Sequence, residues 1–228
     1  MEVLAGLLSL NLSEHGAQWL PGALLNDLAD QRAMFLHLPQ SHAGTRIQGL
    51  EALRPYLAPT GPVGALAAGR LGPDCFAVRA ILFDKTAETN WSLAWHQDRT
   101  ICVRQRLEIE GFGPWTIKGG MHHVAPPFDL LARMVTLRVH LDDVPGTNAP
   151  LMIAPGSHRL GMVAADEAAS VAKTCGRAIC LARAGDAWLY ATPVLHASEA
   201  AAVPGRRRVL QVDFAAEALP TGLEWLGV

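Results

Sequence analysis

Two residues of types that bind metal ions, His96 and Asp98, stand two positions apart in the segment SLAWHQD, residues 92–98. In a strand, residues i and i+2 point to the same face and lie roughly 7 Å apart along the chain, so this pair could bind one cation together. The same alternation predicts that the large side chains point to the opposite face, namely Trp91, Leu93 and Trp95. The pair alone equally fits a His–Asp hydrogen bond at the end of a solvated strand.

A third potential ligand, His196, lies far along the chain in the segment YATPVLHAS, residues 190–198, ahead of an arginine-rich strand. Two histidines and one carboxylate with open coordination positions are typical of non-haem Fe(II) oxygenases. In such a site the free positions accept a bidentate co-substrate and O₂. If that co-substrate has a distal carboxylate, its binding requires a fixed, permanently charged group with two parallel N–H donors. The guanidinium of arginine supplies this better than the ammonium of lysine.

Taken together, these segments resemble the phytanoyl-CoA dioxygenase family of Fe(II)/2-oxoglutarate-dependent oxygenases. The matching motifs occur in the family's order between about Phe76 and Phe214, and they are WHQD, APGSHR, AGDAWLY, LHAS and RRRVLQVDF. The resemblance implies that His96, Asp98 and His196 bind Fe(II) and are the catalytic residues. It also implies co-substrate roles for three residues: Arg207, eleven positions after His196, grips the carboxylate of 2-oxoglutarate, Ser198 assists it, and Gln97 is a lesser candidate.

The phase of the strand RRRVLQVDF indicates which arginine faces the site. Arg207 shares a face with Val209, Gln211 and Asp213, whereas the other face carries Leu210, Val212 and Phe214. We expect the apolar face to pack outward against helices, which points Arg207 into the barrel. Arg206 and Arg208 are expected to be solvated at the turn.

Two further basic residues have more than one interpretation. Arg138 falls where some relatives of the family carry an aromatic residue, and it alternates with aliphatic residues in MVTLRVHLDD, residues 134–143. It is expected to contact 2-oxoglutarate or an anionic substrate, unless the strand lies at the surface with Arg138 pointing outward. Lys85 could close over the co-substrate or be a solvated loop lysine.

The segment GFGPWTIKGGMHHVAPP, residues 111–127, follows the metal-binding motif and has the position of a lid over the substrate. We predict a loop here, then a short helix near Phe128–Arg133. Substrate contacts are expected from Trp115, Lys118 and His123, with His122 beside them, although adjacent histidines in a loop are often only surface residues. Arginines at the cavity mouth would favour an anionic substrate; the candidates are Arg99, Arg104 and Arg106.

The pattern of the chain predicts how these residues are positioned. Residues 1–70 carry apolar residues at helical spacing, notably in 22–38 and 47–59, and are expected to form supporting helices. From Phe76 onward, short segments rich in β-branched and aromatic residues alternate with Gly, Pro and Asn. This pattern predicts an antiparallel sandwich or barrel. The resemblance makes it a double-stranded β-helix (jelly-roll) core over about residues 76–214, within a single domain, 1–228.

Composition limits the remaining classes. With 228 residues, half of them hydrophobic, the chain can bury a substantial core, and a net charge of −2 gives no reason to expect nucleic acid or an anionic membrane as a partner. No secretion signal and no apolar run of eighteen residues is present, so the interpretation is a cytoplasmic protein with an apolar, packed N-terminal edge. Its four cysteines show no CxxC spacing and are expected to be reduced thiols.

The function implied is hydroxylation of a C–H bond of a small, possibly anionic, organic substrate, with Fe(II), 2-oxoglutarate and O₂ as cofactor and co-substrates and with succinate and CO₂ as products. Asp98 occupies the position that halogenating relatives fill with a small residue, which favours hydroxylation. One alternative is a cupin-like isomerase or dioxygenase that does not use 2-oxoglutarate; it predicts further histidine ligands such as His140 and no function for Arg207. Another is a non-catalytic sensor of 2-oxoglutarate or metal.

Overall fold

The computed structural model describes residues 9–36, 44–220 and 222–228. Its helices are α2 (Leu12–His15), α3 (Leu28–Met34), the 3₁₀ turn η1 (Glu51–Leu53), α4 (Arg54–Leu57), α5 (Gly64–Leu71), α6 (Phe128–Ala132), the 3₁₀ turn η2 (Ser157–Arg159) and α7 (Ala168–Cys175). Its strands are β1 (Ala17–Leu20), β2 (Gly44–Ile47), β3 (Phe76–Lys85), β4 (Leu93–His96), β5 (Ile101–Val103), β6 (Trp115–Lys118), β7 (Met121–Val124), β8 (Val135–His140), β9 (Leu151–Ile153), β10 (Ala178–Cys180), β11 (Ala187–Ala191), β12 (His196–Ser198) and β13 (Arg207–Ala215). No described helix has the length and apolarity that crossing a membrane requires.

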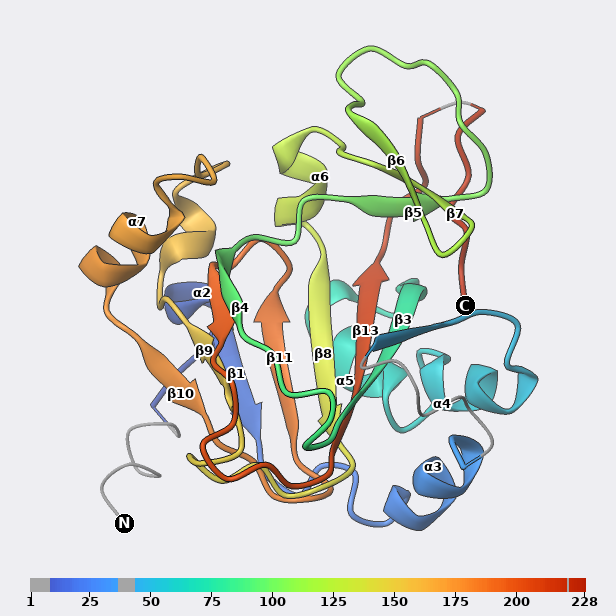
Figure 1. Cartoon of the computed structure of the whole chain (residues 1–228). Coiled ribbons are helices and arrows are strands. Elements are labelled where there is room, and N and C mark those ends of the chain that lie inside the picture. The colour runs from blue at the N-terminus through green and yellow to red at the C-terminus, as the bar shows by residue number, and fades with distance from the viewer. Residues whose placement is uncertain (1–8, 37–43, 221) are drawn as a thin grey trace.

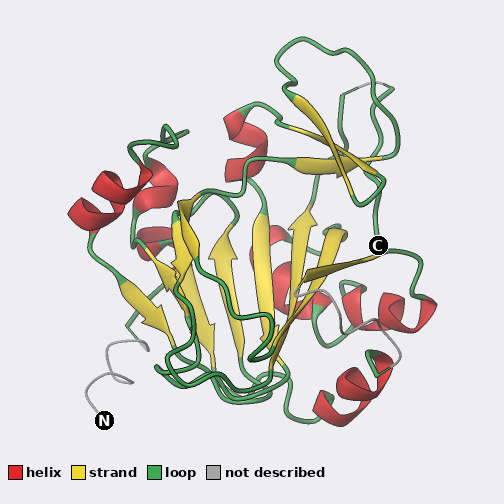
Figure 2. Cartoon of the chain, in the orientation of Figure 1, coloured by secondary structure: helices red, strands yellow, loops and turns green. Residues whose placement is uncertain are grey.

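Three antiparallel sheets organise the chain (Figures 1 and 2). The major sheet has six strands in the order β1-β11-β8-β13-β3-β2, and the minor sheet has four in the order β10-β9-β12-β4. A three-stranded sheet, β5-β7-β6, stands beyond one end of the other two. Neighbours in the order that are far apart in sequence, such as β8 and β13, show the jelly-roll winding, so the predicted double-stranded β-helix is confirmed.

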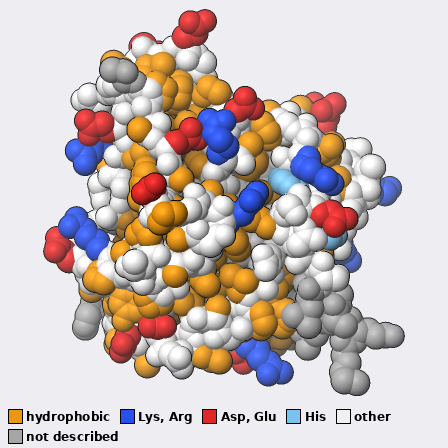
Figure 3. All heavy atoms as spheres, turned by 180° about the vertical axis from the view of Figure 1, so that it is seen from behind, with side chains coloured by type: hydrophobic (Ala, Val, Ile, Leu, Met, Phe, Trp, Pro, Cys, Tyr) orange, Lys and Arg blue, Asp and Glu red, His pale blue; other side chains and the backbone are white. Residues whose placement is uncertain are grey.

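The outer face of the major sheet is covered by helices from the first part of the chain, α3 to α5 (Figure 1). Leu210, Val212 and Phe214 of β13 pack there in one cluster with Leu53 and Ala67, all less than 1 % exposed. Burial of each of the Leu, Val and Phe side chains contributes on the order of 2 kcal/mol to the free energy of unfolding. This arrangement confirms the predicted phase of β13, whose opposite face turns toward the minor sheet. On the helix-covered side of the molecule, acidic and basic side chains are intermixed among apolar ones (Figure 3).

The first seventy residues are less helical than predicted. The helix expected over 22–38 is reduced to α3, because Leu24 donates its backbone N–H to the carbonyl of Gly185 and residues 21–27 follow turns; residues 37 and 38 lie outside the described part. β1 and β2 form the two edges of the major sheet instead of supporting it. These edge strands are four residues long, too short to show an alternating pattern.

Two residues of the AGDAWLY and APGSHR motifs hold this N-terminal segment in place. The Asp186 carboxylate accepts hydrogen bonds from the backbone of Gly22 (2.7 Å) and from the indole of Trp19 (3.2 Å). The His158 ring packs on Gly16, where an added Cβ would lie 2.4 Å from Nδ1. A glycine is therefore required at this position, and both motif residues have structural contacts away from the candidate site.

The segment 111–127 is a hairpin rather than the predicted loop. β6 and β7 pair around Gly119 and Gly120, which have φ values of 58° and 76°, and β7 also pairs with β5. Positive φ at both central residues is the geometry of a tight two-residue hairpin turn. The short helix predicted after the segment is present as α6. The segment AICLARAGDAWLY, residues 178–190, is divided between β10 of the minor sheet and β11 of the major sheet.

Candidate metal centre

His96, Asp98 and His196 converge at one point of the barrel. β4 and β12 are antiparallel neighbours in which His96 and His196 are directly opposite, with ring centroids 4.2 Å apart. One ligand atom from each of the three residues lies within 4.8 Å of the other two. Within residues 9–36, 44–220 and 222–228, no other group of three His, Cys, Asp or Glu side chains approaches so closely, and His140 is not part of this group.

Each imidazole is oriented by its own strand. His96 Nδ1 lies 2.7 Å from the carbonyl of Ala94, and His196 Nδ1 lies 3.0 Å from the carbonyl of Val194. Since a carbonyl oxygen can only accept, Nδ1 carries the proton in both rings and Nε2 keeps its lone pair. Burial, followed by the effect of His96, lowers the pKa of His196 to about 4, so this ring is neutral near pH 7. A neutral imidazole with a free Nε2 is the form that binds a divalent metal.

Asp98 supplies the anionic member of the group. Burial by itself raises the pKa of Asp98, but the nearby Arg79 guanidinium outweighs burial and holds the pKa below its ordinary value. The carboxylate is therefore ionised. Two imidazoles and one carboxylate together form the donor set associated with ferrous iron.

A β-bulge in β4 changes which side chains surround this centre. Leu93 is opposite Ser198 while His96 is opposite His196, so three residue steps on β4 match two on β12. The extra residue turns Leu93 toward the same side as His96, and Leu93 and Trp91 line the pocket around the metal ligands. The prediction that both point away is therefore wrong. Trp95 does point away and packs against the cluster beneath α7.

The pocket at the metal ligands has a volume of about 150 Å³ and lies between the inner faces of the two large sheets. Its apolar lining comes from Ile81, Phe83, Trp91, Leu93, Leu151 and Ala197. Its polar lining, besides the three ligands, comes from Lys85, Arg138, Ser198, Arg207 and Gln211.

Three basic side chains share this small pocket. Arg207 and Lys85 are directly opposite on β13 and β3, and Arg138 is opposite Gln211 on the neighbouring pair of strands. They are 3 %, 6 % and 6 % exposed, respectively. No carboxylate of the described residues lies within ion-pair distance of any of the three. The pocket is therefore strongly positive.

The contacts of these cations leave several hydrogen-bond donors free. Arg138 Nη1 donates to Gln211 Oε1 (2.7 Å), and Arg207 Nη1 donates to the carbonyl of Ala149. The Nε atoms of both arginines are buried and have no partner among the described residues. Lys85 Nζ donates to the carbonyl of Trp91 (2.7 Å) and lies 4.5 Å from the centre of its ring. Burial, followed by Arg207 and Arg138, lowers the pKa of Lys85 to about 8.

The structure thus resolves the interpretations left open for two basic residues. Every residue of β8 is buried, so Arg138 lines the cavity and not the surface. Lys85 is the last residue of β3 and is buried in the pocket. Of the two interpretations of Lys85, the solvated loop lysine is therefore wrong. Of the two other arginines at the start of β13, Arg206 is partly solvated beside Asp84. Arg208 forms a nearly buried pair with Asp142 (2.7 Å), so the prediction that it is solvated is wrong.

The two weaker co-substrate candidates are placed differently. Ser198 lines the pocket, and its Oγ is 3.3 Å from the carbonyl of Ala149, the acceptor that Arg207 also uses. Gln97 does not line the pocket. Its amide donates to the carbonyls of Gly161 (3.0 Å) and Pro193 (2.8 Å) and accepts from the backbone of Val163 (2.9 Å). Gln97 thereby connects the segment after η2 to the turn between β11 and β12, so it supports these loops.

The predicted substrate residues Trp115, Lys118 and His123 lie on the hairpin and do not line the pocket. His123 is buried, with Nδ1 3.0 Å from the carbonyl of Met121 and Nε2 3.0 Å from Cys102 Sγ. The indole of Trp115 packs below Arg106, and Lys118 is exposed.

The arginines expected at the cavity mouth also lie elsewhere. Arg104 pairs with Glu224, Arg106 pairs with Glu108, and Arg99 donates to the carbonyl of Val163.

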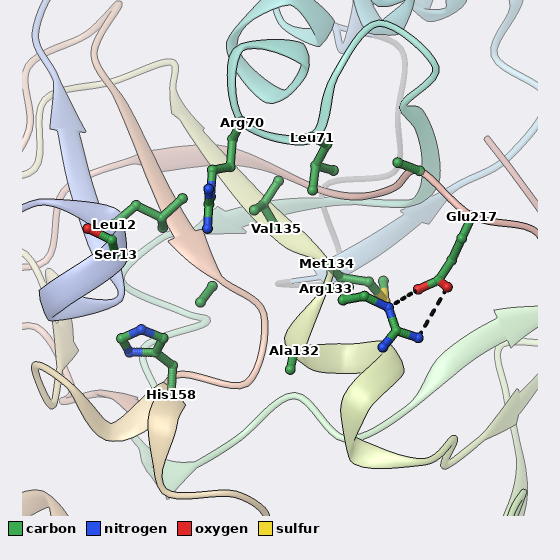
Figure 4. Close-up of a pocket in the computed structure, with 12 residues that line it drawn as sticks. Leu12, Ser13, Arg70, Leu71, Ala132, Arg133, Met134, Val135, His158 and Glu217 are labelled. Carbon is green, nitrogen blue, oxygen red and sulfur yellow. Dashed lines mark hydrogen bonds and ion pairs between the residues drawn. The ribbon is translucent and has the colours of Figure 1, made fainter.

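A larger hollow of about 490 Å³ lies away from the metal ligands, among α2, the end of α5 and the turn before β8 (Figure 4). Arg70 points into it from α5, and His158 borders it from η2. On the opposite wall Arg133 and Glu217 form a paired contact of 2.7 Å, so their charges compensate each other. It contains no described cluster of metal-binding side chains, and the convergent chemistry remains with the smaller pocket.

Comparison with known proteins agrees with this geometry. Residues 62–209 match the sequence model of the family described as phytanoyl-CoA dioxygenase (PhyH). No curated protein matches the chain.

Solved structures share the fold at low sequence identity. EctD from S. alaskensis in its apo form is 18 % identical, with 95 % of this chain and 78 % of that chain covered and a TM-score of 0.65. The epimerase SnoN, in complex with Fe³⁺, alpha-ketoglutarate and nogalamycin RO, is 17 % identical, with coverage of 97 % and 91 % and a TM-score of 0.63. HygX from Streptomyces hygroscopicus, with nickel and 2-oxoglutarate bound, is 14 % identical, with coverage of 90 % and 84 % and a TM-score of 0.60.

Proposed function

Because the chain belongs to the phytanoyl-CoA dioxygenase family, we propose that it is a non-haem Fe(II)/2-oxoglutarate-dependent oxygenase that hydroxylates a small anionic molecule. The observation that carries the proposal is the convergence of His96, Asp98 and His196 within 4.8 Å, beside a pocket with three buried basic groups. We propose His96, Asp98 and His196 as the metal ligands and Arg207 as the group that binds the distal carboxylate of 2-oxoglutarate.

The residues present fit both absent groups. Two Nε2 lone pairs and an ionised carboxylate suit Fe(II) and leave coordination positions for a chelating keto acid and O₂. The buried, unpartnered Nε atoms of Arg207 and Arg138 are donors without an acceptor, which is costly in a protein interior unless a ligand or water satisfies them. A carboxylate is the acceptor that a guanidinium fork matches best.

The protein's own contribution is positioning and charge. When bound, Fe(II), 2-oxoglutarate and O₂ supply the oxidising chemistry, in which the keto acid leaves as succinate and CO₂ and the substrate gains a hydroxyl group. Arg207 orients the keto acid, Ser198 lies beside the same backbone carbonyl, and Phe83 and Trp91 form part of the apolar wall of the pocket. Each group acts by orientation, and the chemistry requires no general base in the pocket.

The charge of the pocket supports an anionic substrate. Lys85, Arg138 and Arg207 together carry three positive charges, and the distal carboxylate of 2-oxoglutarate compensates one of them. The Asp98 carboxylate is already engaged by Arg79. Buried cations are stable when an anion pairs with them, so a substrate carboxylate, phosphate or sulfate near Arg138 would complete the site.

The rival interpretations receive less support. A cupin-like enzyme would use a further histidine such as His140, which is not in the ligand group, and would give Arg207 no function. Because N-terminal side chains and β13 share one core cluster, we also propose that residues 1–228 act as a single domain.

The function is tested by measuring succinate. Aerobic incubation of the protein with Fe(II) and 2-oxoglutarate should form succinate slowly, and the true substrate should accelerate the reaction and appear as a hydroxylated product by mass spectrometry. A panel of small carboxylates, phosphate esters and acyl thioesters, each with an uncharged analogue, tests the anionic class. Absence of succinate under all of these conditions would favour the non-catalytic sensor, and a product of unchanged mass would favour another outcome, such as epimerisation.

Lys85 predicts the pH dependence of 2-oxoglutarate binding. Its pKa in the free protein is about 8, and a bound dianion must raise that pKa, so affinity is highest below about pH 8 and falls as the pH rises through this value. We expect a loss of about threefold to tenfold between about pH 7 and about pH 9 in anaerobic titrations. Lys85→Met should bind more weakly at the lower pH and show a flatter profile. Parallel profiles for the two proteins would show that Lys85 does not contact the co-substrate.

A further inference from the structure

Arg79 connects the candidate metal ligand Asp98 to the major sheet. It lies on the pocket side of β3, where Nη2 is 3.5 Å from Asp98 Oδ2 and Nε is 2.5 Å from Asp213 Oδ2. Its side chain is 10 % exposed. We infer that Arg79 is a positioning residue that holds the Asp98 carboxylate so that one oxygen alone faces the metal, an inference that rests on the function proposed above.

Arg79 is itself held in one orientation. Its second partner, Asp213 on β13, accepts a hydrogen bond from Thr136 Oγ1 of β8 at 2.9 Å, and Thr136 is 3.0 Å from Thr192. These residues are buried, with Asp213 2 % and Thr136 0 % exposed. Asp98 follows β4 of the minor sheet, so the Asp213–Arg79–Asp98 connection bridges the two sheets between which the pocket lies.

A hydrogen-bond donor also reaches the same carboxylate oxygen. Gln211 Nε2 is 3.3 Å from Asp98 Oδ2, and Gln211 Oε1 is fixed by Arg138 Nη1 at 2.7 Å. Oδ2 therefore has an ion-pair contact with Arg79 of β3, whose Nη2 has no hydrogen-bond partner among the described residues, and one hydrogen bond from Gln211 of β13. Oδ1 has no hydrogen bond from any described residue. With Oδ2 occupied in this way, the carboxylate offers the metal a single oxygen. A monodentate carboxylate leaves one more coordination position open than a chelating one, and a keto acid together with O₂ requires three.

The identity of the residue as arginine matters for this role. A planar guanidinium can pair with two carboxylates from one rigid group, whereas the lysine ammonium is a single point charge on a flexible side chain. Hydrogen-bond partners of metal ligands typically change metal affinity about 10- to 100-fold when they are removed. Substitution by lysine keeps the charge between Asp98 and Asp213, so it removes the geometry without leaving two buried carboxylates uncompensated.

The experiment compares Arg79→Lys with Arg208→Lys as a matched control. Arg208 also pairs with a largely buried aspartate, Asp142, but on the opposite face of β13 and away from the pocket. Anaerobic titration with Co(II) alone is followed through its visible d–d bands, and thermal unfolding of the metal-free proteins is followed in parallel. We expect Arg79→Lys to bind Co(II) about 10- to 100-fold more weakly and with an altered band shape, because Asp98 is no longer fixed. Arg208→Lys should lose similar stability and keep both the wild-type affinity and the wild-type bands.

Unchanged Co(II) affinity and bands in a folded Arg79→Lys protein would overturn the inference, as would equal losses in both variants. If Arg79→Lys does not fold, Asp213→Asn provides the same test, since it leaves Arg79 and Asp98 in place and removes the charged anchor at Arg79 Nε. Asp213→Asn must then weaken Co(II) binding. Wild-type Co(II) affinity in this variant would refute the positioning role of Arg79. Failure of the wild-type protein to bind Co(II) at its three ligands would instead overturn the proposed function.

Discussion

Replacing His196 with alanine is expected to reduce metal affinity by more than about 100-fold, which exceeds the usual cost of losing a partner outside the coordination sphere. His196 is one of the three protein donors proposed among the described residues, and its neighbour His96 lies directly opposite on β4. Two remaining donors cannot complete the facial arrangement that ferrous iron requires. Equilibrium dialysis with Fe(II) or Co(II) under anaerobic conditions measures the change, and all formation of succinate should stop with it.

His140→Ala is the matched control for this variant. His140 is also a buried histidine of the barrel interior, 2 % exposed, and burial, followed by Arg138 and Arg207, lowers its pKa well below its usual range. Both of its ring nitrogens lack a partner among the described residues. Metal affinity should remain at the wild-type level when it is removed. Equal losses in the two variants would support the cupin-like alternative, in which His140 also binds the metal.

Arg207→Gln is expected to weaken 2-oxoglutarate binding about 100-fold or more while leaving metal affinity within about twofold of the wild type. Removing one member of a buried, hydrogen-bonded charge pair typically costs about 2–5 kcal/mol of binding free energy, and about 1.4 kcal/mol corresponds to a tenfold change. Arg207 is 3 % exposed and its Nε has no partner among the described residues. Of the groups that line the pocket, Arg138 and Lys85 are the cations that could take its place. Anaerobic titration of the metal-loaded protein with 2-oxoglutarate gives the co-substrate affinity, and titration of the metal-free protein with Co(II) gives the metal affinity.

The neighbouring Arg206→Gln variant provides the control, because Arg206 pairs with Asp84 outside the pocket. It should bind 2-oxoglutarate as the wild type does. Wild-type affinity in Arg207→Gln would assign the distal carboxylate to Arg138 or Lys85 and would leave Arg207 free for the substrate.

The core of the fold could be predicted because its long strands carry a clear period. The strand-like segments predicted from Phe76 onward begin with FAVRAILFDK, which forms β3. The alternation of RRRVLQVDF correctly turns Arg207 inward and Phe214 outward. The grouping of His96, Asp98 and His196 was implied by the resemblance of short motifs to the family, and antiparallel pairing of β4 with β12 is what brings the two histidines together.

Features that depend on tertiary context could not be predicted from the sequence. One extra residue in β4 reverses the phase of Leu93 and Trp91, and no periodic pattern in four residues can reveal a bulge. Lys85 looked like a loop residue because its burial depends on pairing with Arg207, which lies more than a hundred residues away. The role of Arg79 requires knowledge that β3 and β13 are adjacent.

The hairpin, in contrast, did carry a signal in the sequence. Gly119–Gly120 between WTIK and MHHV is a tight-turn pair flanked by residues with strand propensity, which indicates a hairpin rather than a loop. Assigning it as a loop led directly to the placement of Trp115, Lys118 and His123 at the substrate, whereas pairing with β5 draws them away from the pocket.

We expect one ferrous ion, held by His96, Asp98 and His196, to chelate a keto acid that Arg207 fixes at its far end. Anaerobic addition of Fe(II) and then 2-oxoglutarate should produce the weak visible metal-to-ligand charge-transfer absorption of a chelated keto acid. The absorption should saturate at one equivalent per chain and be absent in His196→Ala. A wild-type protein that shows no such absorption at saturating Fe(II) and 2-oxoglutarate, or a His196→Ala protein that shows it undiminished, would contradict the account.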